Sequence, residues 1–327
     1  SVVVGVAGEH VASFNSSGAI AIKQDEVSRD DMKQVLEAAR AVAIPLNRKI
    51  LHVIPQEYIV DDQEGLRNPL GISGVRLEVK VHIVTGSVAS IQNIIKCVNR
   101  AGLDVRDIVL EQLAASESVL TEDEKELGVI FIEVGGGTTD VALFSKGSVR
   151  HTAVLPVGGN QFTNDIAVGL RTPLEEAERI KQSYGCAYKG LMGDDRLLEV
   201  PPVGGGESRQ LSHKLLCEII EPRGEEIFAI AKEQIFQGGM EGLIGSGVVI
   251  TGGSTIMKGM KEIAQQVFKL HVRTGYPSEV KGLNEVTRSP IYSTSVGLLL
   301  YGHRYPVESR EYSYMKKEEN LFNKIKA

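Results

Sequence analysis

A buried strand that breaks into a glycine-rich turn and then resumes constrains this chain more than any other feature. Residues 129–134 read Val-Ile-Phe-Ile-Glu-Val, and residues 141–144 are apolar again. Between them stands Gly135-Gly-Gly-Thr-Thr-Asp140. Glycine allows positive φ and close approach of the backbone to a bound group, while successive N–H groups and threonine hydroxyls can surround an anion. The pattern predicts a strand, a phosphate-binding turn and a second strand, although a glycine hairpin without any ligand fits the same residues.

A second apolar strand also runs into paired glycines, at Val248-Val-Ile-Thr-Gly-Gly-Ser254. The next segment, 258–268, places Ile263, Ala264 and Phe268 on one face of a predicted helix. A strand followed by a Gly-Gly pair and a helix is a common arrangement at nucleotide sites, because glycine has no Cβ and lets the backbone approach the ligand closely. Because the chain has neither Gly-x-Gly-x-x-Gly after a strand nor a P-loop motif, dinucleotide-binding and P-loop folds are disfavoured.

A charged helix lies between these two segments. Thr172 is predicted as its N-cap, Pro173 as its first residue, and Gly185 as the residue that follows its end. Glu178 can accept hydrogen bonds from ribose hydroxyls, and Lys181 lies where it can serve the same ligand. A solvated charged face is the other interpretation of this run.

Hydrophobic periodicity indicates an α/β protein. Strands are predicted at 2–6, 48–59, 76–84 and 105–110, and a helix opened by Ser28 and Asp31 runs over 28–42. Pro55 is expected to interrupt its strand, and 61–74 and 190–208 are expected to be loops or, for 190–208, a hairpin. Pro222 is expected to kink or bound a helix over 215–234. Three short strands from 129 onwards predict an antiparallel edge.

Composition excludes several classes of protein. The net charge of −6 over 327 residues argues against a dedicated nucleic-acid binder. Cys97, Cys186 and Cys217 lie far apart in the sequence, which disfavours a disulfide framework and a structural zinc site. No apolar run reaches membrane-spanning length, and residues 1–6 lack the basic flank of a signal peptide. A cytoplasmic location is expected.

The glycine-rich segments 135–140 and 248–254 resemble motifs of the actin-like ATPase superfamily. Gly135–Thr138 is similar to its second phosphate motif and Thr251–Ser254 to its adenosine motif, while Glu111–Ala115 and Tyr292–Gly297 resemble its connecting helices. Segments 51–58, 68–76, 119–124 and 200–205 narrow the resemblance to the FtsA family of bacterial cell-division proteins. It extends from Val2 to about His303.

The resemblance implies a two-lobed, ribonuclease-H-like ATPase fold with an additional FtsA-specific α+β subdomain. The expected parts are a first-lobe remnant, the extra subdomain, the rest of the first lobe, a phosphate-motif core, a small partner-binding subdomain, an adenosine-motif core and a tail. Their expected bounds are 1–6, 7–85, 86–127, 128–156, 157–239, 240–305 and 306–327.

The resemblance also implies a site for ATP and Mg²⁺. Glu133 and Asp140 would act on the metal through water, although Asp140 is equally suited to capping its own turn. Glu178 and Lys181 would lie beside the ribose. The implied nucleotide-binding backbone and hydroxyl groups belong to Gly135, Gly136, Gly137, Thr138, Thr139, Gly252, Gly253 and Ser254.

The chain departs from the family's pattern at two points. No first phosphate motif precedes Val2, so we interpret the sequence as N-terminally incomplete, with the first phosphate-binding hairpin absent. Glu133 replaces the usual aspartate of the second motif, which moves its carboxylate by one methylene. We therefore expect weak or absent ATP binding by this chain and at most a weak ATPase activity. An interaction module without nucleotide binding and a small-molecule kinase are the alternative functions.

Expected partners follow from the same resemblance. Arg209, Arg223 and Glu226 match positions that the family uses for the FtsZ C-terminal peptide, whereas a salt bridge at a helix start is the alternative role of Arg223. A head-to-tail filament of this protein, and other divisome proteins bound to the extra subdomain, are also implied. The tail 309–327 resembles the family's amphipathic helix for the anionic inner membrane, although its pattern alone favours a disordered charged terminus. The implied location is the cytoplasmic face of that membrane at the division site.

Overall fold

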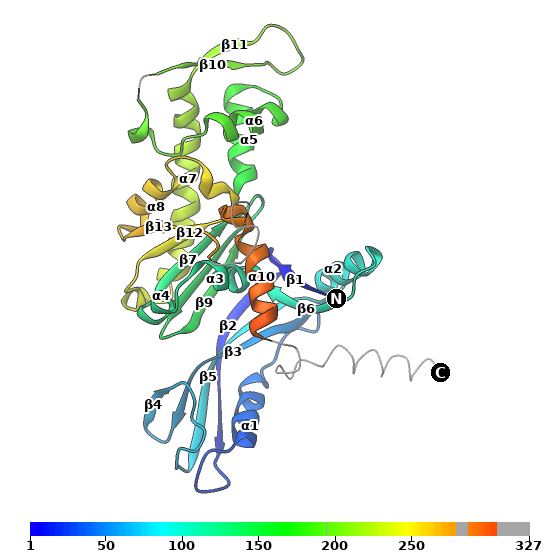
Figure 1. Cartoon of the computed structure of the whole chain (residues 1–327), viewed down its shortest axis with the longest axis vertical. Helices are drawn as coiled ribbons and strands as arrows, with labels where there is room; N and C mark the ends of the chain where they lie inside the picture. Colours follow the sequence, from blue (N-terminus) through cyan, green and yellow to red (C-terminus); the bar gives the residue numbers. More distant parts are fainter. Residues whose placement is uncertain (194, 279–286, 306–327) are drawn as a thin grey trace.

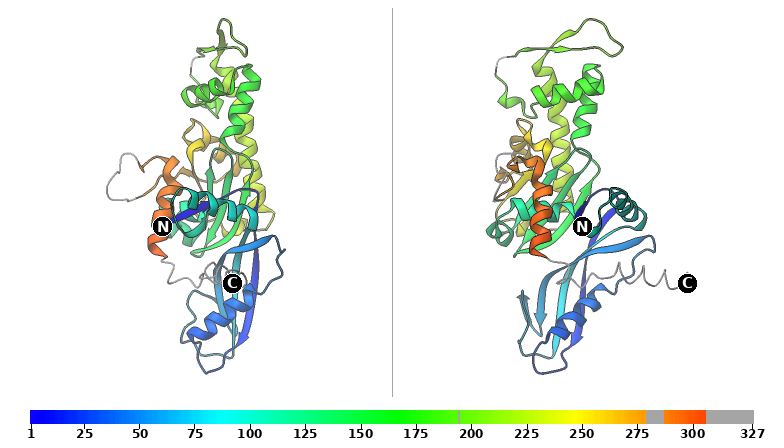
Figure 2. Two further views of the ribbon diagram at one scale, coloured as in Figure 1. Left: turned by 90° about the vertical axis from the view of Figure 1, so that its right-hand side faces the viewer. Right: turned by 45° about the vertical axis from the view of Figure 1, so that its right-hand side comes forward.

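A computed structural model describes residues 1–193, 195–278 and 287–305, and the molecule is elongated in every view (Figures 1 and 2). A four-stranded sheet forms the lower end in Figure 1, a five-stranded sheet the middle, and a helical part the upper end. The tail that we predicted as a membrane helix lies outside the described residues. Among the described residues, no helix combines the length and the apolar character that a membrane span needs.

The lower sheet is antiparallel, in the order β2-β5-β3-β4 (Val11–Ala21, Arg76–Ser87, Arg48–Val60 and Gln63–Leu66). Helix α1 (Arg29–Arg40) covers one face, and Ser28 and Asp31 form the predicted capping box. Alternate residues of β5 are fully buried against α1, as predicted. Strand β3 continues through Pro55, where a bulge accommodates the missing N–H. Strand β2 was not predicted, because its serines and glycine interrupt the alternation of apolar and polar residues that indicates a strand.

Strand β1 (Val2–Val6) pairs in parallel with β6 (Val105–Leu110), and both strands were predicted. Helices α2 (Val88–Arg100), α3 (Glu111–Val119) and α4 (Glu122–Leu127) belong to the same part of the chain. Helix α10 (Ser293–Arg304) packs on α3 so closely that a Cβ at Gly297 would lie 2.0 Å from the Ala114 carbonyl oxygen. The two helices therefore touch through their backbones.

The middle sheet has the order β13-β12-β7-β8-β9. Strands β7 (Val129–Val134), β8 (Thr139–Ser145) and β9 (Ser148–Leu155) form the predicted antiparallel edge. Strands β12 (Val248–Thr251) and β13 (Val272–Thr274) run parallel to β7, and helix α8 (Met260–Phe268) follows β12. Because β7 and β12 are parallel neighbours, the glycine-rich segments that follow them both lie at the carboxyl ends of these strands.

The upper part consists of α5 (Gly159–Leu170), α6 (Leu174–Tyr184), α7 (His213–Phe236) and the hairpin β10–β11 (Leu197–Val200 and Arg209–Ser212). Strand β10 and the turn of the hairpin lie within 190–208, the region predicted to be a loop or hairpin, and β11 begins directly after it. Helix α7 runs through Pro222, so the proline does not bound the helix, since its buried side chains offset the lost hydrogen bond. The alternative, a kink at Pro222, stays a prediction. The predicted N-cap of α6 was wrong. Thr172 is not an N-cap, because its hydroxyl donates to the Pro201 carbonyl at 2.7 Å.

Candidate functional site

The two glycine-rich turns touch each other beyond the carboxyl ends of β7 and β12 in the middle sheet. Ser254 Oγ donates to the Gly135 carbonyl oxygen at 2.8 Å. Gly252 has φ of 92°, and a Cβ there would lie 2.5 Å from the Val134 carbonyl oxygen. Only glycine meets both conditions. The turns are 119 residues apart in sequence, so this contact is a product of the parallel pairing of β7 with β12.

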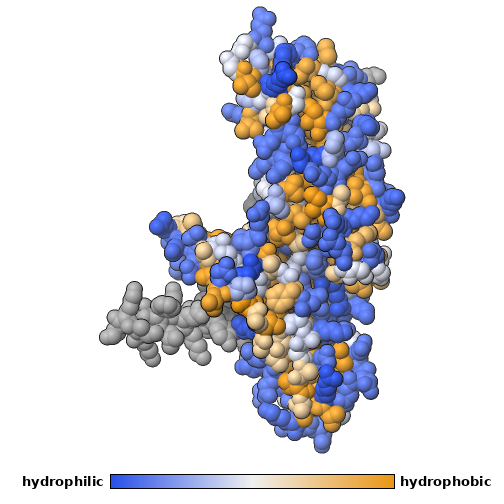
Figure 3. All heavy atoms as spheres, turned by 180° about the vertical axis from the view of Figure 1, so that it is seen from behind, coloured by the Kyte–Doolittle hydropathy of each residue, from blue (hydrophilic) through white to orange (hydrophobic). Residues whose placement is uncertain are grey.

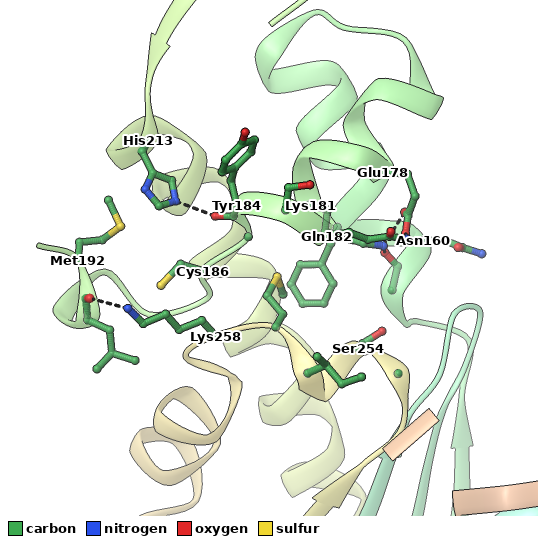
Figure 4. Close-up of a pocket in the computed structure, with 18 of the residues that line it drawn as sticks. Asn160, Glu178, Lys181, Gln182, Tyr184, Cys186, Met192, His213, Ser254 and Lys258 are labelled. Carbon is green, nitrogen blue, oxygen red and sulfur yellow. Dashed lines mark hydrogen bonds and ion pairs between the residues drawn. The ribbon is translucent and has the colours of Figure 1, made fainter. Parts of the chain in front are cut away.

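A cavity of about 890 Å³ opens beside these turns, between α5, α6 and the segment after β12. Figure 4 shows side chains from all of these elements around it. Five predicted site residues line it: Gly136, Glu178, Lys181, Gly253 and Ser254. The remaining predicted nucleotide-binding residues do not: Gly135, Gly137, Thr138, Thr139 and Gly252.

The first turn is held by the N-terminus of α5. The N–H groups of Gly159 and Asn160 donate to the carbonyls of Gly135 and Gly136, at 2.9 and 2.7 Å. None of the three glycines at 135–137 lies in the left-handed region, so they provide space rather than unusual torsion angles. No heavy atom comes within 4 Å of a Cβ built on Gly137, which leaves room for a group above the turn.

The two threonines of the turn have different environments. Thr139 is fully buried, and its hydroxyl donates to the Val157 carbonyl at 2.7 Å. Thr138 Oγ1 donates to Asp140 Oδ2 at 3.0 Å, which is the turn-capping role considered for Asp140. The Thr139 hydroxyl is therefore not available to a bound anion in this arrangement.

Glu133 and Asp140 face each other across the β7–β8 pair and are almost fully buried. Burial, together with the neighbouring charges of Asp140 and Glu111, raises the pKa of Glu133 to about 8 against the hydrogen bond from Thr294. Burial and Glu111 likewise raise the pKa of Asp140 to about 7. Both carboxyl groups are therefore poised to change charge near neutral pH.

Three buried acceptor oxygens have no partner in this region: Glu133 Oε2, Asp140 Oδ1 and Gln112 Oε1. When the two carboxyl groups are ionised, all three oxygens are acceptors, so the partner that is then missing is a donor or a cation. Within the described part of the chain, no three His, Cys, Asp or Glu side chains are arranged to hold a metal directly. Water-mediated contact with Mg²⁺, whose inner shell usually retains several waters, fits this oxygen-rich environment.

Glu178 and Lys181 form an ion pair of 2.6 Å in the cavity wall rather than a solvated surface face. Lys181 Nζ also donates to Thr163 Oγ1 at 2.8 Å and to the Gly159 carbonyl at 3.0 Å. Although partial burial acts in the opposite direction, the hydrogen bonds from Lys181, Thr163 and Gln182 lower the pKa of Glu178. Both side chains are thus fixed beside the first turn of α5.

Several cavity residues were not predicted from the sequence. Asn160 and Gln182 contribute polar groups (Figure 4). Arg196 lies over the Tyr184 ring at 5.2 Å and donates to His213 Nδ1 at 3.3 Å. They come from segments without a motif, so no local signal in the sequence indicated them.

The predicted partner residues lie on the small upper part of the molecule. Arg223 bonds both Asp165 oxygens, at 2.6 and 3.0 Å, and also pairs with Glu226. The Arg223 pair is not at a helix start, because α7 begins ten residues earlier at His213. Arg209 donates to the carbonyls of Leu170 and Arg171 at the end of α5. The structure brings Arg223 and Glu226 together and places Arg209 at the far end of α5.

Comparisons with known proteins show which family this chain belongs to. A family profile described as "Cell division protein FtsA" matches residues 130–297, and one described as "SHS2 domain inserted in FTSA" matches residues 8–85. The cell division protein FtsA of Pseudomonas aeruginosa is 53% identical, over 92% of this chain and 72% of its own length. Those of Neisseria meningitidis and Escherichia coli K12 are 46% and 43% identical, over 91% and 92% of this chain and 72% and 74% of their own lengths.

Solved structures show the fold. A PilM–PilN type IV pilus biogenesis complex is similar with a TM-score of 0.63 at 15% identity, over 92% of this chain and 79% of that one. MreB5 of Spiroplasma citri bound to ADP is similar with a TM-score of 0.54 at 17% identity, over 67% and 66%. The predicted actin-like two-lobed ATPase fold is thereby confirmed. Together with the sequence relatives, these findings show that the chain belongs to the FtsA family of cell-division proteins.

Proposed function

We propose that this protein is an actin-like, ATP-binding scaffold that links FtsZ filaments to the inner membrane and polymerises head to tail. One observation carries the nucleotide part of the proposal. A single cavity joins Gly136 of the phosphate turn, Gly253 of the adenosine turn and the Glu178–Lys181 pair. Its volume of about 890 Å³ is large enough for a nucleotide.

The chemistry of the cavity matches the parts of ATP. Gly137 does not line the cavity, but the open space above it, on the turn that carries Gly136, suits a phosphate group. The Glu178 carboxylate in the cavity wall suits ribose hydroxyls. Mg²⁺, when bound, would neutralise phosphate charge, with Glu133, Asp140 and Gln112 holding its water ligands. Deprotonation of the two carboxyl groups favours the cation, and their raised pKa values make that step dependent on pH.

Replacing Lys181 by alanine is expected to weaken nucleotide binding about ten-fold or more, because the lysine is a charged donor in the cavity wall. Titration with a fluorescent ATP analogue measures this, and the parent chain is expected to bind more weakly than about 1 μM. Arg179→Ala is the matched control on the same helix, since Arg179 pairs with Glu176 away from the cavity. Equal affinities of the two variants would contradict the proposed site.

The proposed FtsZ-binding surface follows α5 and α7 in the upper part of the molecule. Arg223 is held by Asp165 and Glu226, so its guanidinium is oriented before any peptide binds. Val168 on α5, Leu174 on α6 and Leu215 on α7 are exposed, and apolar residues reach the surface at this end of the molecule (Figure 3). Cationic and apolar groups together suit a peptide that carries carboxylates and apolar side chains.

Charge reversal at this surface is expected to reduce binding of a synthetic FtsZ tail peptide about ten-fold or more in co-sedimentation. Arg209→Glu and Arg223→Glu are the test variants, and Arg179→Glu is the control. Because Arg209 also bonds the end of α5, thermal unfolding of each variant must accompany the binding measurement. Unchanged binding by folded variants would remove both residues from the partner surface.

The membrane part of the proposal rests on family membership and on the sequence of residues 309–327. Met315, Leu321, Phe322 and Ile325 are apolar, and four lysines accompany them: Lys316, Lys317, Lys324 and Lys326. Removal of residues 306–327 is expected to abolish co-sedimentation with vesicles of anionic lipid, since apolar burial and charge attraction are lost together. Retention of vesicle binding by the truncated chain would place the membrane contact elsewhere.

A further inference from the structure

The carboxyl group of Glu133 is held by Thr294, a residue far from it in the sequence. Thr294 Oγ1 donates a hydrogen bond to Glu133 Oε1 across a separation of 161 residues. Glu133 lies on β7, directly before the phosphate turn, and Thr294 is the second residue of α10. Glu133 Oε2 is buried and has no partner. One oxygen of this carboxyl group is therefore fixed, and the other is the one that can accept a further donor or a cation.

The start of α10 is fixed in its turn through Ser293. Ser293 Oγ shares a hydrogen bond of 2.7 Å with Thr251 Oγ1 at the end of β12, and the Ser293 carbonyl accepts from Ser118 Oγ of α3 at 2.8 Å. All three residues are fully buried. The backbone contact of Gly297 with α3 is another attachment of the same helix. Because this backbone has little freedom to shift, the Thr294 hydroxyl is a donor in a fixed position.

The length of the Glu133 side chain matches this fixed donor. Aspartate is one methylene shorter, so its carboxyl group at position 133 would stop short of Thr294. Helix α10 cannot follow a shorter side chain, since it is tied to β12 and α3. Strand β7 cannot move toward α10 either, because it is paired on both sides, with β8 and with β12. The hydrogen bond therefore depends on glutamate at this position.

Fixing the Glu133 carboxyl group also fixes its free oxygen relative to two others. Asp140, whose Oδ1 is buried without a partner, lies directly opposite Glu133 in the β7–β8 ladder. Gln112, whose Oε1 is likewise buried without a partner, belongs to α3, which packs on both strands. The terminal torsion angle of a glutamate side chain is broad when nothing restrains it. The bond from Thr294 removes this rotational freedom.

We propose that Thr294 is a positioning residue of the nucleotide site. It holds the Glu133 carboxyl group so that Oε2 joins Asp140 Oδ1 and Gln112 Oε1 around the water ligands of a nucleotide-bound Mg²⁺. This inference rests on the proposed ATP-binding function and adds α10 to the elements that build the site. Thr294 does not line the cavity and acts only through Glu133. Its loss is therefore expected to affect the part of nucleotide binding that depends on magnesium.

Titration of the full chain with a fluorescent ATP analogue, in Mg²⁺ and in excess EDTA, tests this role. Thr294→Val removes the hydroxyl and keeps the branched shape. It is expected to reduce the gain in affinity due to Mg²⁺ about ten-fold and to leave the affinity in EDTA unchanged. Thr294→Ser restores the hydroxyl and is expected to recover most of the gain. Ser295→Ala removes an exposed hydroxyl from the same helical turn and is expected to match the parent.

The outcomes separate this inference from the proposed function. A parent chain that binds no nucleotide in either buffer contradicts the proposed function. A parent that binds the analogue equally well with and without Mg²⁺ overturns the inference alone. So does a Thr294→Val chain that keeps the gain of the parent, or one that loses affinity equally in EDTA.

A double-substitution cycle, measured by urea denaturation, tests the contact without any ligand. In the parent, Thr294→Val leaves the buried Glu133 Oε1 without its donor, so the urea midpoint is expected to fall. In a chain that carries Glu133→Asp, the shorter side chain does not reach Thr294, so adding Thr294→Val is expected to leave the midpoint unchanged. Equal falls in both backgrounds would show that Thr294 stabilises α10 independently of Glu133, which overturns the proposal.

Discussion

Glu133→Gln is expected to raise the free energy of unfolding by about 4 kcal/mol at pH 8.5 and to change it little below pH 4.5. Burial, with the nearby Asp140 and Glu111 carboxylates, raises the pKa of Glu133 to about 8 in the folded protein. The unfolded chain has the ordinary value of 4.5. Between these values the folded state retains a proton that the unfolded state has lost, so this group makes stability fall as pH rises.

Urea denaturation of the parent and of Glu133→Gln, at several values between pH 4.5 and 8.5, measures this difference. Glutamine keeps an oxygen that can accept the hydrogen bond from Thr294, so packing is nearly preserved. Glu64→Gln in the exposed strand β4 is the control, and its pH dependence is expected to match that of the parent. Parallel curves for the parent and Glu133→Gln would show that Glu133 is charged throughout, contrary to the burial argument.

Gly297→Val is expected to lower the free energy of unfolding by about 3 kcal/mol or more. A Cβ at Gly297 would meet the Ala114 carbonyl oxygen at 2.0 Å, and backbone cannot move aside as a side chain can. The added atoms would force α10 away from α3. Helix α3 packs on β7, and α10 begins at Ser293, whose hydroxyl bonds Thr251 at the end of β12. Because β7 and β12 carry the two glycine-rich turns, this separation is also expected to weaken nucleotide binding.

Gly302→Ala is the matched control for this prediction, on the same helix. The added Cβ there would meet Val3 Cγ2 at 2.9 Å, which is the end of a side chain that can rotate. Its expected loss of stability is below about 1 kcal/mol. If guanidinium denaturation gave equal midpoints for the two variants, the backbone contact between α3 and α10 would not be as close as described.

Local signals in the sequence predicted much of the fold. Alternating residues 77–83 are buried as predicted, Ser28 and Asp31 cap α1, and the strands on both sides of Gly135 are present. These features depend on neighbours in sequence, which is why periodicity and capping motifs reveal them. Where local pattern competes with packing, prediction was less successful. Thr172 does not cap α6, because its hydroxyl donates to the Pro201 carbonyl instead. Pro222 lies inside α7 rather than at its boundary, because buried residues on both sides hold the helix together.

The candidate site could be predicted only in part. Glycine motifs and the family resemblance indicated Gly136, Glu178, Lys181 and Gly253, which line one cavity. Arg196 and His213 complete its wall without belonging to any motif. Their positions depend on how the hairpin β10–β11 and α7 pack on α6, and such long-range packing leaves no short-range pattern in the chain.

The sequence by itself determined the family, the α/β class and the two glycine-rich turns, because each of them depends on short runs of neighbouring residues. Only the tertiary structure decided that the turns touch through Ser254, that Thr139 turns its hydroxyl inward, and that Glu133 loses its water and retains its proton. These properties depend on burial and on distances between segments that are separated in the sequence, by 18 residues for Thr139 and Val157 and by 119 for Gly135 and Ser254. Chain folding sets both, and no local run of residues encodes them.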